Sequence, residues 1–490
     1  MKIAIASPEV FPFAKTGGLA DVAGALPKAL AKLGEEVSVV MPLYKIIDRK
    51  KYEIRDTGKT AYAMMDDKKV EARIHEGGLP GGVKVWFLEV PEYYGRDHLY
   101  MTKTGDDPDN AERFIYLSKI IPEALKAVGF RPDVIQLNDW QTALVPLYLK
   151  TRYRDDPFFQ NTATLFTVHN LGYQGLFWSV DMHWTGLGWE YFTPEGLEFY
   201  GKLNVMKAGL IYSDIVNTVS KTYSREIQTP DYGYGLDGVL RNRAEDLYGI
   251  VNGIDYDEWD PETDKNIYKN YGAGDLRGKH ANKKELKAEL GLATGNQPLF
   301  GIISRLADQK GLDILSEAID GILKLGAQFI LLGTGDEKYH KLFSALASAR
   351  PRQVSATLGF DVKLANRIYA ASDVFLMPSL YEPCGLGQLI SLRYGTIPLV
   401  RKTGGLADTV KNYSPRTGKG TGFVFSDYSA KALMKAVRAA LDAYGERPLW
   451  KELVVRAMEE DNSWDNSAKE YIKLYKKAAE KARARLKKAA

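Results

Sequence analysis

Two lysines, each followed closely by a pair of glycines, begin almost identical octapeptides near opposite ends of the chain. Residues 15–22 read KTGGLADV and residues 402–409 read KTGGLADT. Each follows an apolar run typical of a strand and leads into a helical pattern, so we predict two strand-to-helix turns. The N–H groups of such a turn, the following helix N-terminus and the lysine charge can bind a phosphate. One Gly-Gly pair alone would more simply be a packing turn, but the repeated lysine favours an anion site in both copies.

Two further cations lie near a predicted helix start in the second half of the chain. Arg305 and Lys310 stand on either side of a turn that enters the helical sequence GLDILSEAI. Two positive charges and a helix N-terminus can converge on one diphosphate. From these two residues alone, an exposed pair of charges on a loop explains the pattern equally well.

Glu382 lies in a turn whose main chain could hold the hydroxyls of a sugar. It lies in YEPCGLG (381–387), where a proline fixes the turn and the glycines expose N–H groups that can hold hydroxyls. Such a glutamate is otherwise more often a helix cap or a surface charge. His169 could bind a hydroxyl, although a satisfied buried histidine is the simpler interpretation of that residue alone. Asp139-Trp140 offers a carboxylate and a sugar-stacking ring, although a lone tryptophan is usually a core residue.

Several motifs that would indicate a nicotinamide, P-loop or metal site are incomplete in this chain. No G-x-G-x-x-G follows the first predicted strand, which argues against a nicotinamide cofactor, and Gly418-Lys419 is followed by Gly420, which excludes a P-loop. Asp107 and Asp109 have the look of a metal-binding pair, but they lie in a polar loop with no nearby histidine. We therefore predict no metal site.

The elements that must position these residues are short apolar, β-branched runs that alternate with helical stretches. This alternation is typical of an α/β protein with parallel sheets. Ligands of such sheets bind beyond the carboxyl ends of the strands, where most of the residues named above stand. The predicted strands are 2–6, 36–41, 83–88, 133–137, 163–168 and 214–219, then 298–303, 327–332, 353–357, 373–377, 396–400 and 422–425.

Length and composition describe an ordinary globular protein of more than one domain. The 490 residues suit two domains of about 200–250 residues each. With 45% hydrophobic residues, a net charge of +4 and dispersed basic side chains, we expect no nucleic-acid partner. No apolar run is long enough to cross a membrane, and the single Cys384 fits a reducing cytoplasm.

Seven motifs between residues 15 and 409 resemble those of the bacterial glycogen synthase and starch synthase family, and the match extends in order from Lys2 to about Tyr475. They are KTGGLADV (15–22), NDWQ (138–141), FTVHNLGYQG (166–175), VNGID (251–255), SRLADQKG (304–311), YEPCGL (381–386) and RKTGGLADT (401–409). The resemblance implies a GT-B fold, in which two Rossmann-like domains with parallel sheets face each other across a deep cleft. It also implies retaining transfer of glucose from ADP-glucose to the non-reducing end of an α-1,4-glucan, such as glycogen or maltooligosaccharides, with no cofactor besides this donor substrate.

The domain bounds combine the resemblance with the sequence pattern. A stretch rich in Gly, Asp and Tyr over about 250–295 separates the two series of strands and places the crossing near Val251. In the family, a C-terminal helix crosses back to the first domain. We therefore predict an N-terminal domain of 1–251 on the acceptor side, joined by a helix over 466–490, and a nucleotide-sugar domain of 252–465.

The resemblance also implies roles for individual residues. Glu382, with the main chain of Cys384 and Gly385, would hold the glucosyl hydroxyls and stabilise oxocarbenium-like charge. The rest of the expected catalytic set contacts the glucosyl unit or neutralises the diphosphate, and comprises His169, Asp139, Lys310 and Arg305. The expected donor-binding residues are Lys15, Gly17, Gly18, Asp21, Asn170, Asn252, Arg305, Lys310, Cys384, Gly385, Leu386, Thr403 and Gly404.

The chain departs from the family pattern at two places. The family's H-x-H-D-W-H segment reads Gln136-Leu-Asn138-Asp139-Trp140-Gln141, which keeps Asp-Trp and replaces the flanking histidines. Ile390 stands where many related retaining transferases carry the second glutamate of E-x7-E, so no second carboxylate is expected on the ribose. Two alternatives stay open: another GT-B enzyme, such as a UDP-sugar transferase or a glucan phosphorylase, and a non-catalytic glycan-binding protein.

Overall fold

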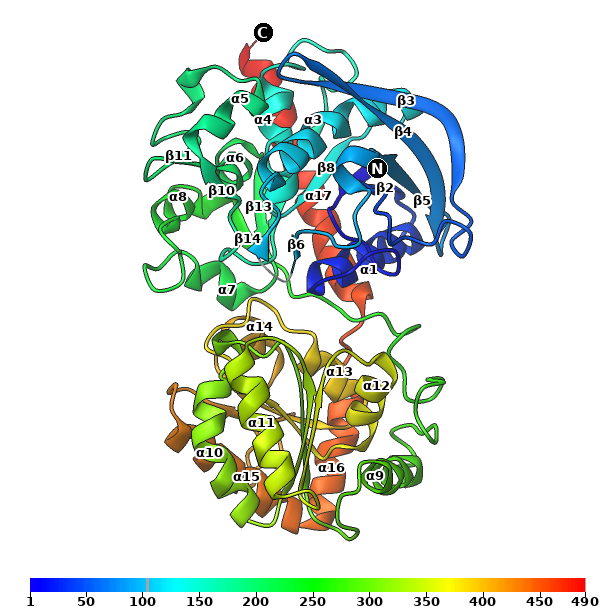
Figure 1. Ribbon diagram of the computed structural model, residues 1–490, viewed down its shortest axis with the longest axis vertical. Coiled ribbons are helices and arrows are strands. Elements are labelled where there is room, and N and C mark those ends of the chain that lie inside the picture. Colours follow the sequence, from blue (N-terminus) through cyan, green and yellow to red (C-terminus); the bar gives the residue numbers. More distant parts are fainter. Residues whose placement is uncertain (103–104, 490) are drawn as a thin grey trace. The chain divides into compact units, whose positions relative to one another are not determined.

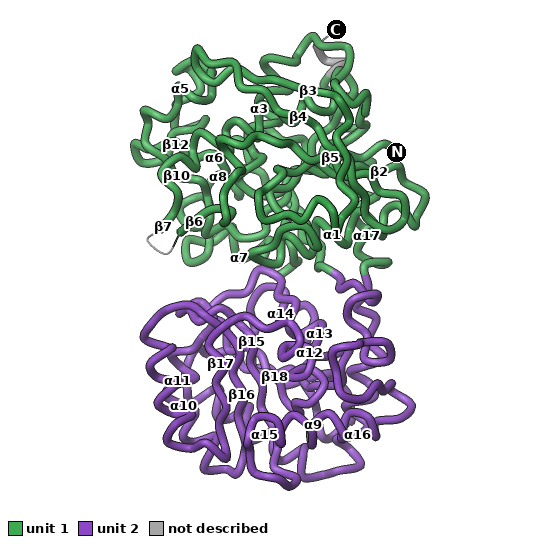
Figure 2. The backbone as a smooth tube through the Cα atoms, turned by 45° about the vertical axis from the view of Figure 1, so that its right-hand side comes forward, with its two compact units in different colours: residues 1–252, 464–490 green, residues 253–463 purple. Residues whose placement is uncertain are grey.

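The chain forms two compact units, each with a hydrophobic core of its own (Figure 2). The computed structural model describes residues 1–102 and 105–489. Unit 1 comprises residues 1–252 and 464–490, and unit 2 comprises residues 253–463. Ala490, the last residue of the predicted 466–490 helix, lies outside the described residues.

Unit 1 is built on a nine-stranded sheet with the order β14-β13-β9-β8-β1-β2-β5-β4-β3. From β14 to β5 the neighbouring strands are parallel, and their continuous apolar runs are buried on both faces, as expected of a parallel sheet. All six strands predicted for this half are present. The parallel strands are β1 (Lys2–Ala6), β2 (Glu36–Pro42), β5 (Val83–Glu89), β8 (Val134–Asn138), β9 (Ala163–Val168), β13 (Ile215–Thr218) and β14 (Leu247–Gly249).

A long hairpin that the sequence pattern did not predict lies at one edge of this sheet. Strands β3 (Arg55–Met65) and β4 (Lys68–Leu79) pair with each other and with β5 in antiparallel fashion. Their sequences are rich in charges, and buried residues alternate with exposed ones over much of both strands. A search for continuous apolar, β-branched runs therefore does not detect these two strands. With them, the sheet is mixed rather than purely parallel.

The helix α17 (Trp464–Ala489) packs on unit 1, where it contacts α1 (Gly18–Lys32) and β9. Its buried residues recur at helical spacing and form one apolar stripe. They include Ala468, Tyr471, Tyr475, Ala478 and Ala482. Figure 1 shows α17 beside the sheet of this unit.

The remaining elements of unit 1 are short, except for one long buried helix, α3 (Asn110–Val128). The other helices are α2 (Pro91–Tyr94), α4 (Val145–Lys150), α5 (Met182–Thr185), α6 (Val205–Tyr212), α7 (Lys221–Glu226) and α8 (Asp237–Asn242). The small strands are β6 (Met101–Thr102), β7 (Gly105–Asp106), β10 (Leu176–Trp178), β11 (Glu198–Phe199) and β12 (Lys202–Asn204).

Unit 2 is built on a six-stranded sheet with the order β17-β16-β15-β18-β19-β20, and every neighbouring pair is parallel. All six strands predicted for this half are present. They are β15 (Leu299–Ile303), β16 (Gln328–Gly333), β17 (Val354–Leu358), β18 (Val374–Met377), β19 (Ile397–Arg401) and β20 (Phe423–Phe425).

Helices cover both faces of this second sheet (Figure 1). One face carries α10 (Leu312–Lys324), α11 (Glu337–Ala349) and α15 (Ala430–Gly445). The other carries α9 (Arg277–Glu289), α12 (Val362–Ala371) and α13 (Gly387–Arg393), with α14 (Gly404–Thr409) and α16 (Arg447–Glu459) completing the unit. None of the helices in the described ranges has the length and apolar character needed to cross a membrane.

The strand order reverses once in each sheet. In unit 1 the reversal lies between β1 and β8, and in unit 2 it lies between β15 and β18. The loops after two such strands diverge to opposite faces and leave a crevice where ligands of open α/β sheets bind. The loops after these four strands therefore define the candidate site of each unit.

Candidate functional site

The loop after β1 carries the first glycine turn, and the turn leads into α1 as predicted. Lys15 Nζ lies 2.7 Å from a carboxylate oxygen of Asp21, in the first turn of α1. Burial raises the pKa of Asp21 in spite of the neighbouring Lys15 charge. A Cβ atom at Gly17 would meet nothing within 4 Å, so neighbouring protein atoms do not require a glycine there. The open space beside the turn is what a ligand approaching its main chain needs.

Glu9 occupies the N–H groups of this first turn. The main-chain N–H groups of Thr16 and Gly17 both donate to its carboxylate, and the Thr16 hydroxyl donates to it at 2.6 Å. The Tyr100 hydroxyl donates a further bond at 2.8 Å. The turn thus binds an anion, but the anion is a side chain of the same unit, and Lys15 is the cation of this loop.

Asp139 and His169 come together at the carboxyl ends of neighbouring strands. Asp139 directly follows β8, His169 directly follows β9, and the main-chain N–H of His169 donates to the Asp139 carboxyl at 2.7 Å. Burial raises the pKa of Asp139 to about 8, against the opposing effect of N–H groups from His169 and Asn170. Burial also lowers the pKa of His169 to about 3, so the imidazole is neutral at physiological pH.

The neighbours of this pair include one core residue and one turn residue. Trp140 is buried, packs edge-on against Phe114 and Phe177, and belongs to the core rather than to a sugar-stacking surface. Asn170 is half-buried, and its side-chain oxygen accepts from Gly172 N–H at 3.0 Å.

In unit 2, Lys310 and Glu382 form a nearly buried ion pair at the strand reversal. Lys310 Nζ lies 2.7 Å from Glu382 Oε2, and the Ser379 hydroxyl donates to the same oxygen at 3.1 Å. Lys310 follows β15 and Glu382 follows β18, so two adjacent parallel strands bring the pair together. Arg305, in the same loop as Lys310, is exposed and donates to the Gln309 side chain at 3.2 Å.

The second glycine turn packs directly against the Glu382 loop. Cβ atoms at Gly404, whose φ is 43°, and at Gly405 would collide with main-chain oxygens of Glu382 and Cys384. The Gly405 N–H donates to the oxygens of Glu382 and Pro383, at 3.2 and 3.1 Å. These glycines are therefore required by close packing, which the sequence analysis had set as the alternative to anion binding.

The other predicted residues of this loop pair lie beside Glu382. Cys384 and Thr403 are buried, and Gly385 has a φ of 74° that favours glycine. Leu386 is the N-cap residue of α13. Asn252, the last residue of unit 1 before the crossing, is buried, and its side-chain oxygen has no hydrogen-bond partner among the described residues.

The Asp107–Asp109 pair forms ion pairs with arginines. Asp107 accepts from Arg113 at 2.8 Å, and Arg96 contacts both carboxylates. His98 lies 2.9 Å from Asp107, contrary to the expectation of no nearby histidine. Within residues 1–102 and 105–489, no three His, Cys, Asp or Glu side chains are grouped as metal ligands.

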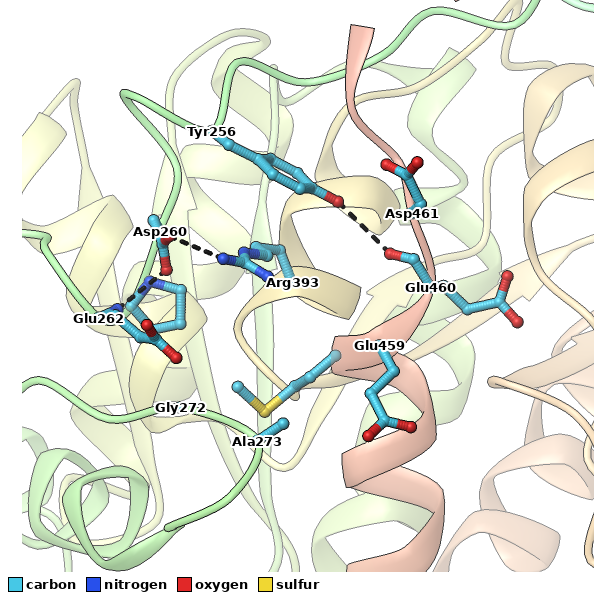
Figure 3. Close-up of a pocket in the computed structure, with 11 residues that line it drawn as sticks. Tyr256, Asp260, Glu262, Gly272, Ala273, Arg393, Glu459, Glu460 and Asp461 are labelled. Carbon is cyan, nitrogen blue, oxygen red and sulfur yellow. Dashed lines mark hydrogen bonds and ion pairs between the residues drawn. The ribbon is translucent and has the colours of Figure 1, made fainter. Parts of the chain in front are cut away.

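Figure 3 shows a pocket of about 250 Å³ in unit 2 that none of the predicted site residues lines. Arg393 crosses it, pairs with Asp260 at 2.7 Å and stacks on Tyr256. The acidic side chains around it are Asp260, Glu262, Glu459, Glu460 and Asp461. Neither Lys310 nor Glu382 lines this pocket.

Three residues of the site were not chosen from the sequence. Glu9 supports the first turn, Ser379 supports Glu382, and Asn138 accepts from His169. Asn138 stood inside a quoted motif and could have been selected. Glu9 and Ser379 carry no motif, because their roles depend on how a loop folds back on itself.

Known proteins match the chain over both units. Residues 2–242 match the family model of the starch synthase catalytic domain, and residues 282–453 match glycosyl transferases group 1. The chain is 50% identical to the glycogen synthase of Thermosipho africanus over 99% of this chain and 100% of that protein. It is 49% identical to the glycogen synthase of Thermotoga maritima, over 98% of this chain and 99% of that protein.

Solved structures agree with these matches. The catalytic domain of starch synthase IV from Arabidopsis thaliana, bound to ADP and acarbose, superposes with a TM-score of 0.91 at 34% identity, over 98% of this chain and 99% of that one. A sucrose-phosphate synthase from Thermosynechococcus elongatus shares the fold, with a TM-score of 0.58 at 19% identity over 97% and 98% of the two chains. The protein has the GT-B fold of two α/β units, and it belongs to the bacterial glycogen synthase and starch synthase family.

Proposed function

We propose that this protein transfers glucose from ADP-glucose to the non-reducing end of an α-1,4-glucan, with retention of the anomeric configuration. Within the family to which the chain belongs, the observation that carries the proposal is the Lys310–Glu382 pair at the strand reversal of unit 2. It places a carboxylate and a cation side by side, with a second cation, Arg305, in the same loop as Lys310. A glucosyl diphosphate needs these groups, because its sugar gains positive charge and its leaving group gains negative charge.

Arg305 and Lys310 neutralise the departing diphosphate. Preorganised positive charge at a developing anion is usually the largest single contribution to such catalysis. Lys310 already contacts Glu382 at 2.7 Å, so it can be shared between this carboxylate and a bound phosphate. The main chain of Cys384 and Gly385 holds the sugar hydroxyls next to Glu382.

Glu382 stabilises positive charge on the transferring sugar and does not become glucosylated. A retaining enzyme that works by double displacement needs an ionised carboxylate as nucleophile. Asp139, the candidate nucleophile of unit 1, has a pKa of about 8 because it is buried, so it is mostly protonated at neutral pH. A protonated carboxyl is a poor nucleophile, which favours front-face transfer in which the leaving phosphate oxygen accepts the proton of the acceptor hydroxyl.

The unit 1 residues orient the transferring glucose and complete the donor site. His169 is neutral and hydrogen-bonds a sugar hydroxyl, while Asp139 and Asn170 contact the same sugar. Lys15 adds positive charge near the phosphates, and Asn252 offers a side-chain oxygen without a partner among the described residues. We place the reaction in the cytoplasm, where reducing conditions suit the single cysteine of the chain.

The function is tested by offering ADP-glucose and UDP-glucose in parallel, each with and without glycogen, and measuring release of the nucleoside diphosphate. We expect fast release from ADP-glucose only when glycogen is present, together with growth of the glucan chains. Fast release without any acceptor would indicate a hydrolase. No release from either donor in the presence of glycogen would contradict the proposal.

Substitutions in unit 2 test the assigned roles. Arg305→Ala, Lys310→Met and Glu382→Gln should each lower kcat at least about a hundredfold, the loss of about 3 kcal/mol of transition-state stabilisation. Calorimetry of ADP binding separates them: Arg305→Ala and Lys310→Met weaken ADP, whereas Glu382→Gln leaves its affinity within a few fold, since this carboxylate acts on the sugar.

The matched control is Lys411→Ala, which removes a lysine from an exposed ion pair with Glu460 at 3.0 Å in the same unit. Its turnover and ADP affinity should equal those of the wild-type protein. Normal turnover in any of the three folded site variants would remove that residue from the proposed machinery.

A further inference from the structure

A buried chain of hydrogen bonds links α17 to the imidazole of His169. The Tyr475 hydroxyl donates to Gln136 Oε1, and Gln136 Nε2 donates to Thr167 Oγ1 at 3.2 Å and to Asn138 Oδ1 at 3.5 Å. The same Asn138 oxygen lies 2.9 Å from His169 Nε2. All of these side chains are buried, so their hydrogen bonds are not exchanged with bulk water.

The partners of Asn138 fix which way round its amide lies. Its Nδ2 donates to the main-chain oxygen of Ala6 at 3.0 Å, and a carbonyl oxygen can only accept. Turning the amide over would place two oxygens face to face at Ala6 and two donors face to face at Gln136. Asn138 Oδ1 therefore faces His169 as an acceptor, and His169 Nε2 must carry the proton.

The neutral imidazole then has only one nitrogen left as an acceptor. Burial keeps the pKa of His169 at about 3, so a second ring proton is absent at neutral pH. With the proton on Nε2, the lone pair is on Nδ1. This ring nitrogen can accept a hydrogen bond from a hydroxyl and cannot donate one.

We propose that Asn138 and Gln136 are positioning residues that hold His169 in the Nε2-protonated tautomer, so that Nδ1 accepts from a sugar hydroxyl. Tyr475 connects this chain of hydrogen bonds to α17. The sugar as hydroxyl donor rests on the proposed function, whereas the tautomer rests on the hydrogen bonds alone. This chain has amides at 136 and 138, where the pattern named in the resemblance has histidines. A histidine can exchange tautomers or gain a proton, but an amide tied to Ala6 O offers His169 one acceptor at any pH.

The charged and titratable groups around the ring come from three neighbouring loops or elements. Asp139 accepts from the His169 main-chain N–H, Glu9 of the β1–α1 loop interacts electrostatically with Asp139, and Tyr223 of α7 accepts from Leu171 N–H at 3.1 Å. A substitution at position 138 keeps all three of these groups. A change in the titration of His169 in such a variant is therefore caused by the loss of the Asn138 side chain.

The tautomer can be measured without substrate, by nitrogen NMR of the protein labelled with ¹⁵N-histidine. The chain has six histidines, and His169→Gln identifies the resonances of His169 by their loss. We expect a protonated Nε2, an unprotonated Nδ1 and no titration between about pH 5 and 9, given the low pKa of this ring. A protonated Nδ1 in the wild-type protein would overturn the proposal.

Two substitutions of Asn138 should change the His169 resonances in different ways. Asn138→Leu removes the acceptor, so the ring should populate both tautomers. Asn138→Asp places a carboxylate at Nε2, which favours the imidazolium and should bring the titration of His169 into the measurable range. Wild-type resonances in both variants would show that Asn138 does not set the ring.

Kinetics separates positioning from a general structural role. Asn138→Leu should lower kcat about tenfold while the KM for the donor changes less than about threefold, and Asn138→His should recover part of the loss. Tyr475→Phe should lower kcat about two- to threefold, by removing the hydroxyl at the far end of the chain. The matched control is Tyr471→Phe, which removes an equally buried hydroxyl of α17 whose partner is Asn217, outside the chain to His169.

Each kinetic outcome has one meaning. Equal losses in Tyr475→Phe and Tyr471→Phe would assign the effect to packing of α17 and contradict the link. Unchanged kcat in Asn138→Leu would contradict the positioning role, even if the NMR shift is seen. A protein that transfers no glucose at all would contradict the proposed function and leave the tautomer measurement valid.

Discussion

Asp139 occupies a main-chain conformation that few residues other than glycine adopt. Its φ is 55° and its ψ is −176°. Holding a residue with a side chain in such a region costs about 1–3 kcal/mol. The conformation turns the chain directly after β8 and brings the carboxyl to the His169 main-chain N–H at 2.7 Å. The protein therefore tolerates strain at a position whose side chain we propose contacts the transferring sugar.

This strain predicts an unusual order of stability for two variants that lack the carboxyl. Asp139→Gly should be more stable than Asp139→Ala by about 1–2 kcal/mol, because only the alanine keeps a Cβ in the disfavoured conformation. At an ordinary position the glycine variant is the less stable one. Urea unfolding of both proteins measures the difference, and both should transfer glucose far more slowly than the wild type. An alanine variant as stable as the glycine variant would show that Asp139 is not strained.

At the scale of elements, the first glycine turn is stabilised by a carboxylate of its own loop. Glu9 accepts from two main-chain N–H groups, the Thr16 hydroxyl and the Tyr100 hydroxyl. All four groups donate to the Glu9 carboxylate, and the two main-chain N–H groups can only donate, so the turn needs a hydrogen-bond acceptor at this place. This arrangement fixes the segment between β1 and α1 that carries Lys15.

We predict that Glu9→Ala destabilises unit 1 by about 2–4 kcal/mol, because it leaves the main-chain N–H groups of Thr16 and Gly17 without their acceptor. Tyr100→Phe removes only one of the four donors and leaves no donor unpaired, so it should cost about 1 kcal/mol. Chemical denaturation followed by tyrosine and tryptophan fluorescence measures both. Equal stability of Glu9→Ala and the wild-type protein would mean that the turn does not depend on this side chain.

The sequence predicts those elements best in which a local pattern decides the structure. The twelve predicted strands and the C-terminal helix are present, because buried parallel strands and an amphipathic helix leave strong periodic signals. The β3–β4 hairpin was missed because its strands contain many charged and exposed residues and no continuous run of β-branched apolar residues. The contact of Gly404 with Glu382 was not predicted because it joins loops after different strands. Long-range contacts of this kind cannot be predicted from either local sequence.

At the scale of the whole molecule, the chain crosses between two cores twice. It leaves unit 1 after Asn252 and returns at Trp464. The residues of α17 that are fully buried belong to the core of unit 1, and Tyr471 also accepts from Asn217 of β13 at 3.0 Å. Unit 2 has separate apolar clusters, made of residues between Ile254 and Met458. The last helix of the chain therefore stabilises the unit that contains the first residues.

This division predicts that a cavity in α17 destabilises one unit and leaves the other unchanged. Tyr471→Ala should lower the free energy of unfolding of unit 1 by about 3 kcal/mol, the usual cost of removing a large buried side chain. Tyr394→Ala, which removes an equally buried ring of unit 2, is the matched variant with the opposite expectation. Pulsed thiol labelling reports unit 2 alone, because Cys384 is the only cysteine of the chain and is buried in that unit.

On heating, Tyr471→Ala should lose part of its circular dichroism at a lower temperature than the wild type, while Cys384 becomes accessible at the wild-type temperature. Tyr394→Ala should expose Cys384 early. Early thiol exposure in Tyr471→Ala would mean that the two cores unfold together, because loss of packing in unit 1 would then also unfold unit 2. Independent unfolding requires that each core retain its own cooperative packing when the other is lost, as separate domains of this size do.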